Sequence, residues 1–135
     1  MRIVVDAYAW IEIFIGSEKG RKAQEILGTA SYACTPGTVL AEVARKYLRE
    51  GIDADIVKDR LKIIAEATSI ATIDMEAALE AARCYLKLSD EAKRARLRAP
   101  SLFDAIVLAT AKLDKAKVLT GDEHLKNQSE VIWMG

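Results

Sequence analysis

The sequence predicts an α/β fold in which a parallel sheet of four to five short strands lies between two layers of helices. Short, almost wholly apolar runs recur along the chain, and stretches with apolar residues at helical spacing separate them. Strands that are apolar on both sides need helices over both faces of their sheet. The length of 135 residues, 51% of them hydrophobic, fits one domain over residues 1–135.

The strands are predicted from their length and composition. In chain order they cover residues 3–5, 31–34, 69–73, 117–120 and 131–133. The first is a β-branched run that ends at Asp6, and the fourth ends at Thr120, with only Gly121 before Asp122. Short apolar runs of this kind are typical of buried strands in a parallel sheet.

The helices are predicted from apolar residues three and four positions apart. In chain order they cover residues 7–14, 18–27, 36–50, 54–67, 75–88 and 102–113, with a brief helical turn at 122–126. We expect Gly28 to close the second helix, and Thr35 to cap the third with Pro36 at its first position. Ser101 is the expected cap of the helix that begins at residue 102, after a charged stretch at 89–98.

Charge and composition exclude several classes of protein. Twenty Lys and Arg residues balance twenty Asp and Glu residues, so any nucleic-acid binding must be local. No apolar run is long enough for a signal peptide or a membrane span, so we expect a soluble, cytoplasmic protein. Cys34 and Cys84 have mostly apolar neighbours and no metal-binding spacing, which predicts buried, reduced thiols.

Four acidic residues are expected at one edge of the predicted sheet. Asp6 and Asp122 follow the first and fourth strands, and ligands of open parallel sheets bind at the carboxyl ends of the strands. Glu42 lies about two turns into the helix after the second strand. Asp104 lies in the first turn of the helix that Ser101 opens. Early positions of helices that follow strands share this edge.

Each of these carboxylates also has a simpler explanation. Asp6 and Asp122 are good N-caps and stabilise helix starts through the local dipole. Asp104 fits a capping box with the serine three residues earlier, with aspartate in place of the usual glutamate. Glu42 is too far from its helix start to be a cap, but it can pair with Lys46 one turn later. Taken one at a time, the residues leave both explanations open.

The cost of gathering four carboxylates limits what such a site can be. At a separation of about 5 Å, each pair repels by roughly 3 kcal/mol at an effective dielectric of ~20. Protonation or a divalent cation must offset that repulsion, and oxygen ligands alone favour Mg²⁺ or Mn²⁺ over zinc. This is the chemistry of metal-assisted phosphodiester hydrolysis, in which the metal activates water and stabilises developing charge.

The ordered set of motifs resembles a known family. The set is Val4-Val5-Asp6 with Trp10 following, Glu42 in the third helix, Ser101-x-x-Asp104-Ala105-Ile106-Val107-Leu108-Ala109-Thr110-Ala111, and Thr120-Gly121-Asp122-Glu123-His124. It resembles the PIN domain, and the size and element order resemble a VapC-type toxin ribonuclease over residues 3–133. One departure is Leu125, where the family's frequent Asp-x-His-Phe turn carries phenylalanine, and we expect that change to affect packing only.

The resemblance implies a three-layer, Rossmann-like fold and a Mg²⁺- or Mn²⁺-dependent endoribonuclease acting on single-stranded or looped RNA. It implies that Asp6, Glu42, Asp104 and Asp122 are catalytic metal ligands, and that the Thr120 hydroxyl supports a carboxylate or a bound water. It also implies a homodimer restrained by a small VapB-type antitoxin, which would make the chain the toxin of a type II toxin–antitoxin pair.

Two other functions remain open at this point. One is a PIN-domain nuclease of RNA processing or decay that has no antitoxin. The other is a non-catalytic α/β module that binds one Mg²⁺, such as a response-regulator-like receiver. Two absences argue against the non-catalytic module. The sequence has no glycine-rich phosphate loop after the first strand. It also lacks the pair that a receiver would have, an aspartate after the third strand together with a lysine after the fifth strand.

Three further features have two interpretations each. His124, the sole histidine, is either a general acid or substrate contact, or a structural residue. The basic residues between Lys87 and Arg98 either hold phosphates or form a solvated helix face. Three aromatic residues after the first acidic residue either stack on bases or pack in the core or a dimer interface: Tyr8, Trp10 and Phe14.

Overall fold

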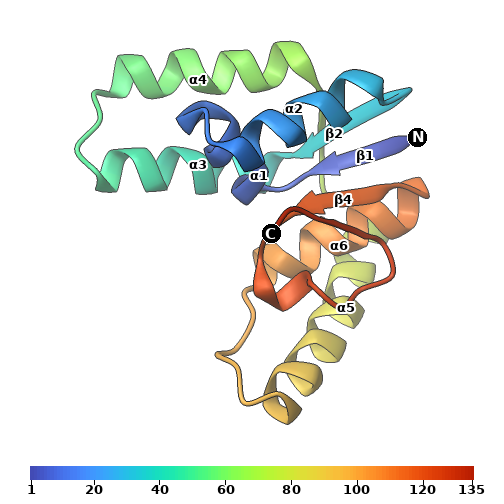
Figure 1. Ribbon diagram of the computed structural model, residues 1–135. Coiled ribbons are helices and arrows are strands. Elements are labelled where there is room, and N and C mark those ends of the chain that lie inside the picture. Colours follow the sequence, from blue (N-terminus) through green and yellow to red (C-terminus); the bar gives the residue numbers. More distant parts are fainter.

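A five-stranded sheet, parallel throughout, forms the centre of the molecule in the computed structural model, which describes residues 1–135 (Figure 1). In chain order the strands are β1 (Arg2–Val5), β2 (Tyr32–Pro36), β3 (Ser69–Ala71), β4 (Lys117–Thr120) and β5 (Val131–Trp133). Their order across the sheet is β3-β2-β1-β4-β5, and every neighbouring pair is parallel. The predicted α/β class and parallel sheet are therefore confirmed.

Helices connect the strands and cover both faces of the sheet. They are α1 (Ala7–Ile15), α2 (Glu18–Thr29), α3 (Gly37–Arg49), α4 (Ala54–Ala67), α5 (Met75–Arg94) and α6 (Leu102–Asp114), with a short 3₁₀ helix, η1 (Glu123–Leu125). In Figure 1, α1 to α4 occupy the upper part of the molecule, and α5 and α6 the lower part. No helix is both long and apolar enough to cross a membrane.

The chain reverses its direction across the sheet between β1 and β4. It moves outward from β1 through β2 to β3, then returns past β1 to form β4 and β5. Val5 of β1 is paired with Leu119 of β4, and the Asp6 amide continues the pairing by donating to the Leu119 carbonyl at 3.2 Å. Both strands therefore end at the same place, the topological switch point where open α/β sheets bind ligands.

The core explains why α6 carries so many consecutive apolar residues. This helix packs against β1, β2 and β4 on one side and against α5 on the other. Residues 105–109 are all buried, whereas an amphipathic helix covered on one side would bury only a stripe. The two cysteines, Cys34 and Cys84, are buried free thiols, as their surroundings predicted.

The predicted start of α3 was wrong. Pro36 is the last residue of β2 and the N-cap of α3, and it makes no side-chain capping bond. Thr35 is fully buried within β2, where its hydroxyl accepts a hydrogen bond of 3.1 Å from Trp10 Nε1 and lies 2.7 Å from the Thr68 hydroxyl. Thr35 cannot cap the helix because these tertiary contacts hold its hydroxyl.

Two predicted helix ends were also wrong. Helix α2 continues through Gly28 to Thr29 instead of closing at the glycine. Helix α5 continues to Arg94, through more than half of the charged stretch at 89–98 that was expected to link two helices. The reason is that Leu88 and Ala92, four positions apart, are both buried and extend the apolar face of the helix into that stretch.

Candidate metal centre

The aspartates that follow β1 and β4 are held at the switch point by the helices they start. Asp6 is the N-cap of α1, and its Oδ1 accepts a 2.8 Å hydrogen bond from the Ala7 amide. Asp122 is the N-cap of η1, and its Oδ1 accepts a 2.8 Å bond from the His124 amide. Asp6 and Asp122 can therefore cap their helices and also belong to a site, because the capping bonds fix the direction of both carboxylates.

Asp104 is held by a capping box at the start of α6. Its Oδ2 accepts a 2.9 Å hydrogen bond from the Ser101 amide, while the Asp104 amide donates to the Ser101 hydroxyl at 3.2 Å. Only 8% of Asp104 is exposed. The bond uses Oδ2 alone, so Oδ1 has no protein donor and is available to a ligand.

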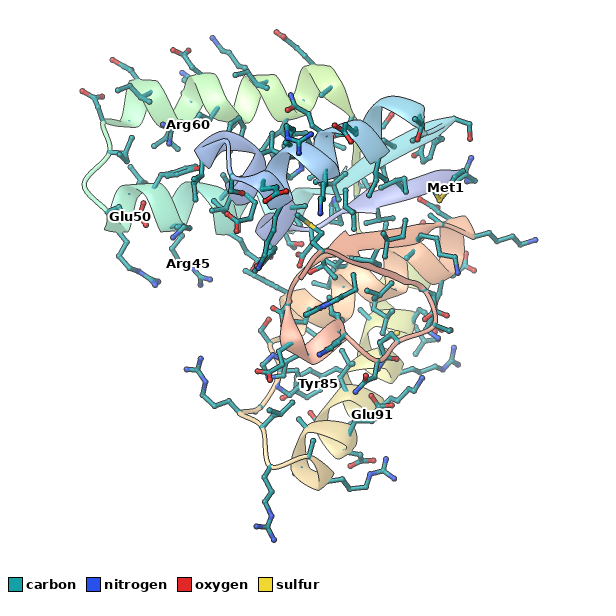
Figure 2. The ribbon with its side chains drawn as sticks, in the orientation of Figure 1. Met1, Arg45, Glu50, Arg60, Tyr85 and Glu91 are labelled. Carbon is teal, nitrogen blue, oxygen red and sulfur yellow. The ribbon has the colours of Figure 1, made fainter.

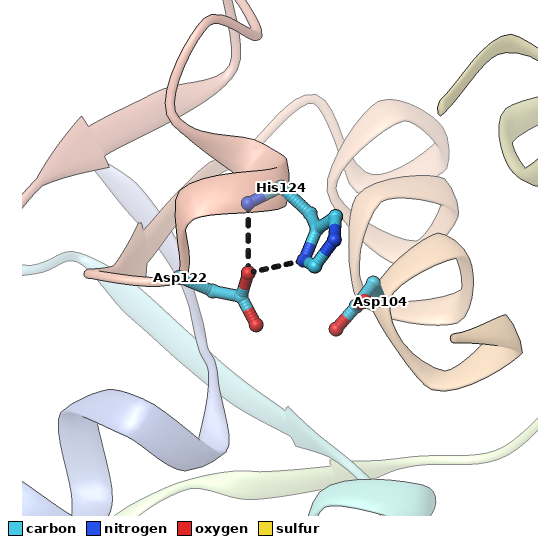
Figure 3. Close-up of side chains that lie close together, drawn as sticks. All are labelled: Asp104, Asp122 and His124. Carbon is cyan, nitrogen blue, oxygen red and sulfur yellow. Dashed lines mark hydrogen bonds and ion pairs between the residues drawn. The ribbon is translucent and has the colours of Figure 1, made fainter. Parts of the chain in front are cut away.

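Asp104 and Asp122 lie close together, although they come from separate elements. Asp104, Asp122 and His124 each offer a ligand atom, and these atoms lie within 4.8 Å of one another. Figure 3 shows the Asp104 carboxylate directed toward Asp122, with the His124 ring beside them. The Asp122 Oδ2 atom, like Oδ1 of Asp104, has no hydrogen-bond donor in the protein.

The Thr120 hydroxyl connects the ends of β1 and β4. It donates a 2.7 Å hydrogen bond to Asp6 Oδ2 and accepts a 2.9 Å bond from the Asp122 amide. Thr120 is fully buried and Asp6 is 4% exposed. Each oxygen of Asp6 therefore accepts one hydrogen bond within the protein.

Glu42 reaches this cluster from α3, and its contacts rule out the simple surface pair. Lys46 forms its ion pair with Glu50 at 2.8 Å, so it does not neutralise Glu42. The Glu42 Oε1 atom is buried and has no hydrogen-bond partner, and the same holds for the Thr38 hydroxyl one turn earlier. An unpartnered buried oxygen is costly, which indicates a ligand at this position.

The pKa values of three of the carboxylates are raised, first by burial and then by the charges of their acidic neighbours. Burial raises the pKa of Asp6 to about 6 against the lowering effect of the Thr120 hydrogen bond, and Asp122 and Asp104 add repulsion. Burial and then the charges of Asp6 and Asp104 raise the pKa of Glu42 to about 8. Burial and the charge of Asp122 also raise the pKa of Asp104. Protons thus relieve the repulsion when no cation does.

His124 connects the carboxylate cluster to the loop before α6. Its Nε2 lies 2.6 Å from the Arg98 carbonyl, and its Nδ1 lies 3.2 Å from Asp122 Oδ1. Burial lowers the pKa of His124, but the bonds to Arg98 and Asp122 outweigh it, so the pKa is raised overall. Both partners are acceptors, which favours a doubly protonated ring. In the metal-free protein both ring nitrogens of His124 therefore contact an acceptor.

A pocket of about 480 Å³ opens beside the carboxylates, and Asp6, Glu42 and Asp122 are part of its lining. Tyr8 also lines it, whereas Trp10 is buried and stacks on Phe14 with ring centroids 5.9 Å apart. Of the three aromatic residues considered for base stacking, only Tyr8 thus lies at the site. The basic residues at 93–98 are exposed, and their loop contacts the site through the Arg98 carbonyl.

Several residues at the site were missed from the sequence. Thr38 and Arg45 lie four positions before and three after Glu42, which places them near it on α3. Arg45 lowers the pKa of Glu42, and it lines the pocket with Lys46 and Arg49. The helical spacing of Thr38 and Arg45 from Glu42 could have indicated that they lie near it. That spacing points to the site only once Glu42 is known to face the other carboxylates.

Comparison with known proteins assigns the chain to a family. The PIN domain family model matches residues 3–131, so the chain belongs to the PIN domain family. A comparison with curated protein sequences finds no match. The sequence motifs and the family model therefore agree on the class of protein, and the match covers every element that supplies a carboxylate to the cluster.

Solved structures with a similar fold include toxin–antitoxin proteins. A toxin–antitoxin complex from Klebsiella pneumoniae is 19% identical, with 98% of each chain covered and a TM-score of 0.72. The sarcin–ricin loop cleaving toxin VapC20 of Mycobacterium tuberculosis is 17% identical, with 96% of each chain covered and a TM-score of 0.73. VapBC2 of Rickettsia felis, bound to promoter DNA, is 16% identical, with 98% and 97% covered and a TM-score of 0.70.

Proposed function

We propose that this protein is a Mg²⁺- or Mn²⁺-dependent endoribonuclease. The observation that carries the proposal is that Asp6, Glu42, Asp104 and Asp122 come from four separate elements and lie near enough for the other three to raise the pKa of Glu42. The buried Oε1 of Glu42 has no partner in the protein. Only a cation or protons can offset this concentration of negative charge. A set of carboxylate oxygens without cysteine or a free imidazole suits a hard divalent ion.

The four carboxylates would hold the metal, and the capping bonds would keep them in place. A divalent ion held there would supply the positive charge needed to activate water and to offset charge on the leaving oxygen. The Thr120 hydroxyl fixes the orientation of Asp6. His124 holds Asp122 and the loop at 95–101 together, so its role is to position a ligand and not to transfer a proton.

The biological role that we propose is that of a toxin in a type II toxin–antitoxin pair. Its support is the family together with the fold similarity to VapC20, a toxin that cleaves the sarcin–ricin loop, and to toxin–antitoxin complexes. By this proposal the chain acts in the cytoplasm as a homodimer, and a VapB-type antitoxin restrains it. RNA is the proposed substrate for the same reason.

The nuclease proposal is tested by cleavage of a folded RNA with a single-stranded loop. We expect cleavage with Mg²⁺ or Mn²⁺, none with a chelator, and a loss of at least about 100-fold for Asp6→Asn and Asp104→Asn. Asp90→Asn is the matched control, because Asp90 is exposed on α5 and outside the cluster. Cleavage that survives the chelator or both substitutions would contradict the proposed mechanism.

The toxin proposal is tested in cells. We expect growth arrest when the protein is expressed alone and relief when the product of a small adjoining gene is co-expressed. Asp104→Asn should abolish the arrest without lowering the protein level. Equal growth with and without induction of the wild-type protein would contradict the toxin role while leaving the nuclease activity to its own test.

A further inference from the structure

One wall of the pocket beside the carboxylates is basic. Arg45, Lys46 and Arg49 of α3 line the same pocket as Asp6, Glu42 and Asp122. Figure 2 shows Arg45 extending from α3 on the side away from α4, with Glu50 at the end of the helix. A positively charged helix face and the candidate metal centre therefore share one opening.

The two arginines of this wall have no acidic partner. Lys46 is paired with Glu50 at 2.8 Å, but Arg45 and Arg49 form no ion pair with any carboxylate. Both are exposed. They lie four positions apart on one helix face, roughly 6 Å from each other at Cβ, a separation similar to that of successive phosphates in an extended strand. Their charges are free to act on a bound ligand.

A substrate strand needs such a wall because the rest of the site repels it. The protein has no net charge to attract a polyanion, and Glu12 adds a fourth carboxylate to the pocket lining. A metal held by the carboxylates would offset charge at the phosphate that it contacts. The neighbouring phosphates need cations from the protein, and α3 supplies the cations that line this pocket.

We propose that Arg45 and Arg49 bind the backbone phosphates of the RNA next to the cleaved bond, so that the strand leaves the metal centre along α3. This inference rests on the proposed function, and it adds the substrate-binding surface of that site. Arginine suits the task because its planar guanidinium binds phosphate through two parallel hydrogen bonds. Arg45 also connects the two parts of the site, since its charge acts on Glu42.

Binding is measured by fluorescence anisotropy with a labelled single-stranded RNA that the wild-type protein cleaves. All proteins carry Asp104→Asn, so that the RNA stays intact in Mg²⁺. We expect Arg45→Ala with Arg49→Ala to weaken binding at least about tenfold and to reduce the salt slope by about 1.4, the amount for two lost single-strand phosphate contacts. Arg45→Lys with Arg49→Lys should retain the slope and lose part of the affinity.

The matched control is Lys58→Ala with Lys62→Ala, an exposed pair four positions apart on the neighbouring helix α4 and outside the pocket lining. This lysine variant loses two positive charges, as the double arginine-to-alanine variant does. An equal loss of RNA affinity in both double variants would overturn the proposal, because the effect would then come from total charge. Thermal melting checks that each variant folds.

Cleavage with the Asp104 side chain intact gives a second measurement. We expect the double arginine variant to raise KM at least about tenfold and to change kcat much less. If that variant has wild-type RNA affinity and KM, the proposal that Arg45 and Arg49 bind RNA is wrong. The proposed nuclease activity would not be affected by that result. A variant that keeps RNA affinity but loses binding of the antitoxin would assign the wall to a protein partner and would also overturn it. If the wild-type protein cleaves no RNA, the proposed function fails and this inference fails with it.

Discussion

The Thr120 hydroxyl at the end of β4 donates a 2.7 Å hydrogen bond to Asp6 Oδ2 at the end of β1. The bond is fully buried and joins residues 114 positions apart in the chain. It orients a carboxylate whose other oxygen already caps α1. Asp6 is thereby presented to the other acidic residues in one direction, which is the arrangement a metal ligand needs.

Replacement of Thr120 by valine tests this relationship. The substitution keeps the shape but removes the donor to Asp6 and the acceptor of the Asp122 amide. We expect about a tenfold loss of Mn²⁺ affinity, the range found for residues that orient metal ligands, and a higher pKa for Asp6. Isothermal titration calorimetry measures the affinity, and Thr120→Ser should restore most of it.

The matched control is Thr110→Val. The Thr110 hydroxyl donates to the Ile106 carbonyl within α6 and does not contact the cluster. Its loss should leave Mn²⁺ affinity within about twofold of the wild-type value, because no ligand changes its orientation. Unchanged affinity in Thr120→Val would mean that Asp6 does not bind the metal or is held by other groups.

Glu42→Gln tests the charge repulsion in the metal-free protein. The pKa of Glu42 is about 8 in the folded chain against an ordinary value of 4.5. Between about pH 4.5 and pH 8, the folded state therefore holds a proton on Glu42 that the unfolded state has released. The free energy of unfolding falls as pH rises through this range, because the folded state must ionise a buried, repelled carboxyl. Glutamine cannot ionise, so the variant should melt about 3 °C higher than the wild type at pH 8.5 and nearly equally at pH 5.

The measurement is thermal melting in a chelator across this pH range, with Glu66→Gln as the control. Glu66 is exposed on α4 and has no ion-pair partner, so we expect no pH-dependent difference for it. Saturating Mn²⁺ should reverse the order, because the wild type gains a ligand that the glutamine variant lacks. A constant difference at all pH values would argue against a buried, repelled Glu42.

His124 gives a direct spectroscopic test because it is the only histidine. Its bonds to the Arg98 carbonyl and to Asp122 favour the charged ring, so its pKa in the metal-free protein should lie above 6.5. The stability that these bonds provide is fully present below pH 6.5 and is lost as pH rises through the folded-state pKa. NMR titration of the untagged protein measures it, and Asp122→Asn should lower the pKa. A wild-type pKa at or below 6.5 would contradict the proposed bonding.

Two glycines of α2 provide a stability test with opposite signs. A Cβ at Gly20 would overlap the carbonyl of Glu12, because α1 and α2 cross closely there, whereas a Cβ at Gly28 would meet no atom within 4 Å. Gly20→Ala should cost about 1–3 kcal/mol of unfolding free energy. Gly28→Ala should add about 0.5–1 kcal/mol, since alanine favours the helix. Urea denaturation measures both, and equal effects would contradict the close helix crossing.

Local chemistry predicted most of the elements. The apolar run at 117–120 became β4 with the expected bounds, and Ser101 caps α6 through the capping box that its spacing with Asp104 indicated. The errors arose where a distant contact overrode a local preference. Thr35 was assigned to a cap because threonine is a good N-cap, but Trp10 and Thr68 engage its hydroxyl inside the sheet. No local pattern records a partner 25 or 33 residues away.

The sequence was enough to expect acidic residues at this edge of the sheet, but not the direction of their side chains. Asp6 and Asp122 follow strands, and the rule that parallel strands share an edge was enough to expect them together. The direction of each side chain was not predictable, because the Thr120 bond, the unpartnered oxygen of Glu42 and the bridge from His124 to Arg98 all join separate elements.

The amino-acid sequence alone was enough to predict the class of fold, the order of strands and helices, and one edge of the sheet at which four carboxylates are expected. It did so because these features depend on periodicity, capping and the shared edge of a parallel sheet. The residues that surround the carboxylates were known only from the three-dimensional structure. Burial and Coulomb interactions depend on distances between chain segments. The unpartnered oxygen of Glu42 and the unpaired arginines of α3 could therefore be identified only in the folded structure.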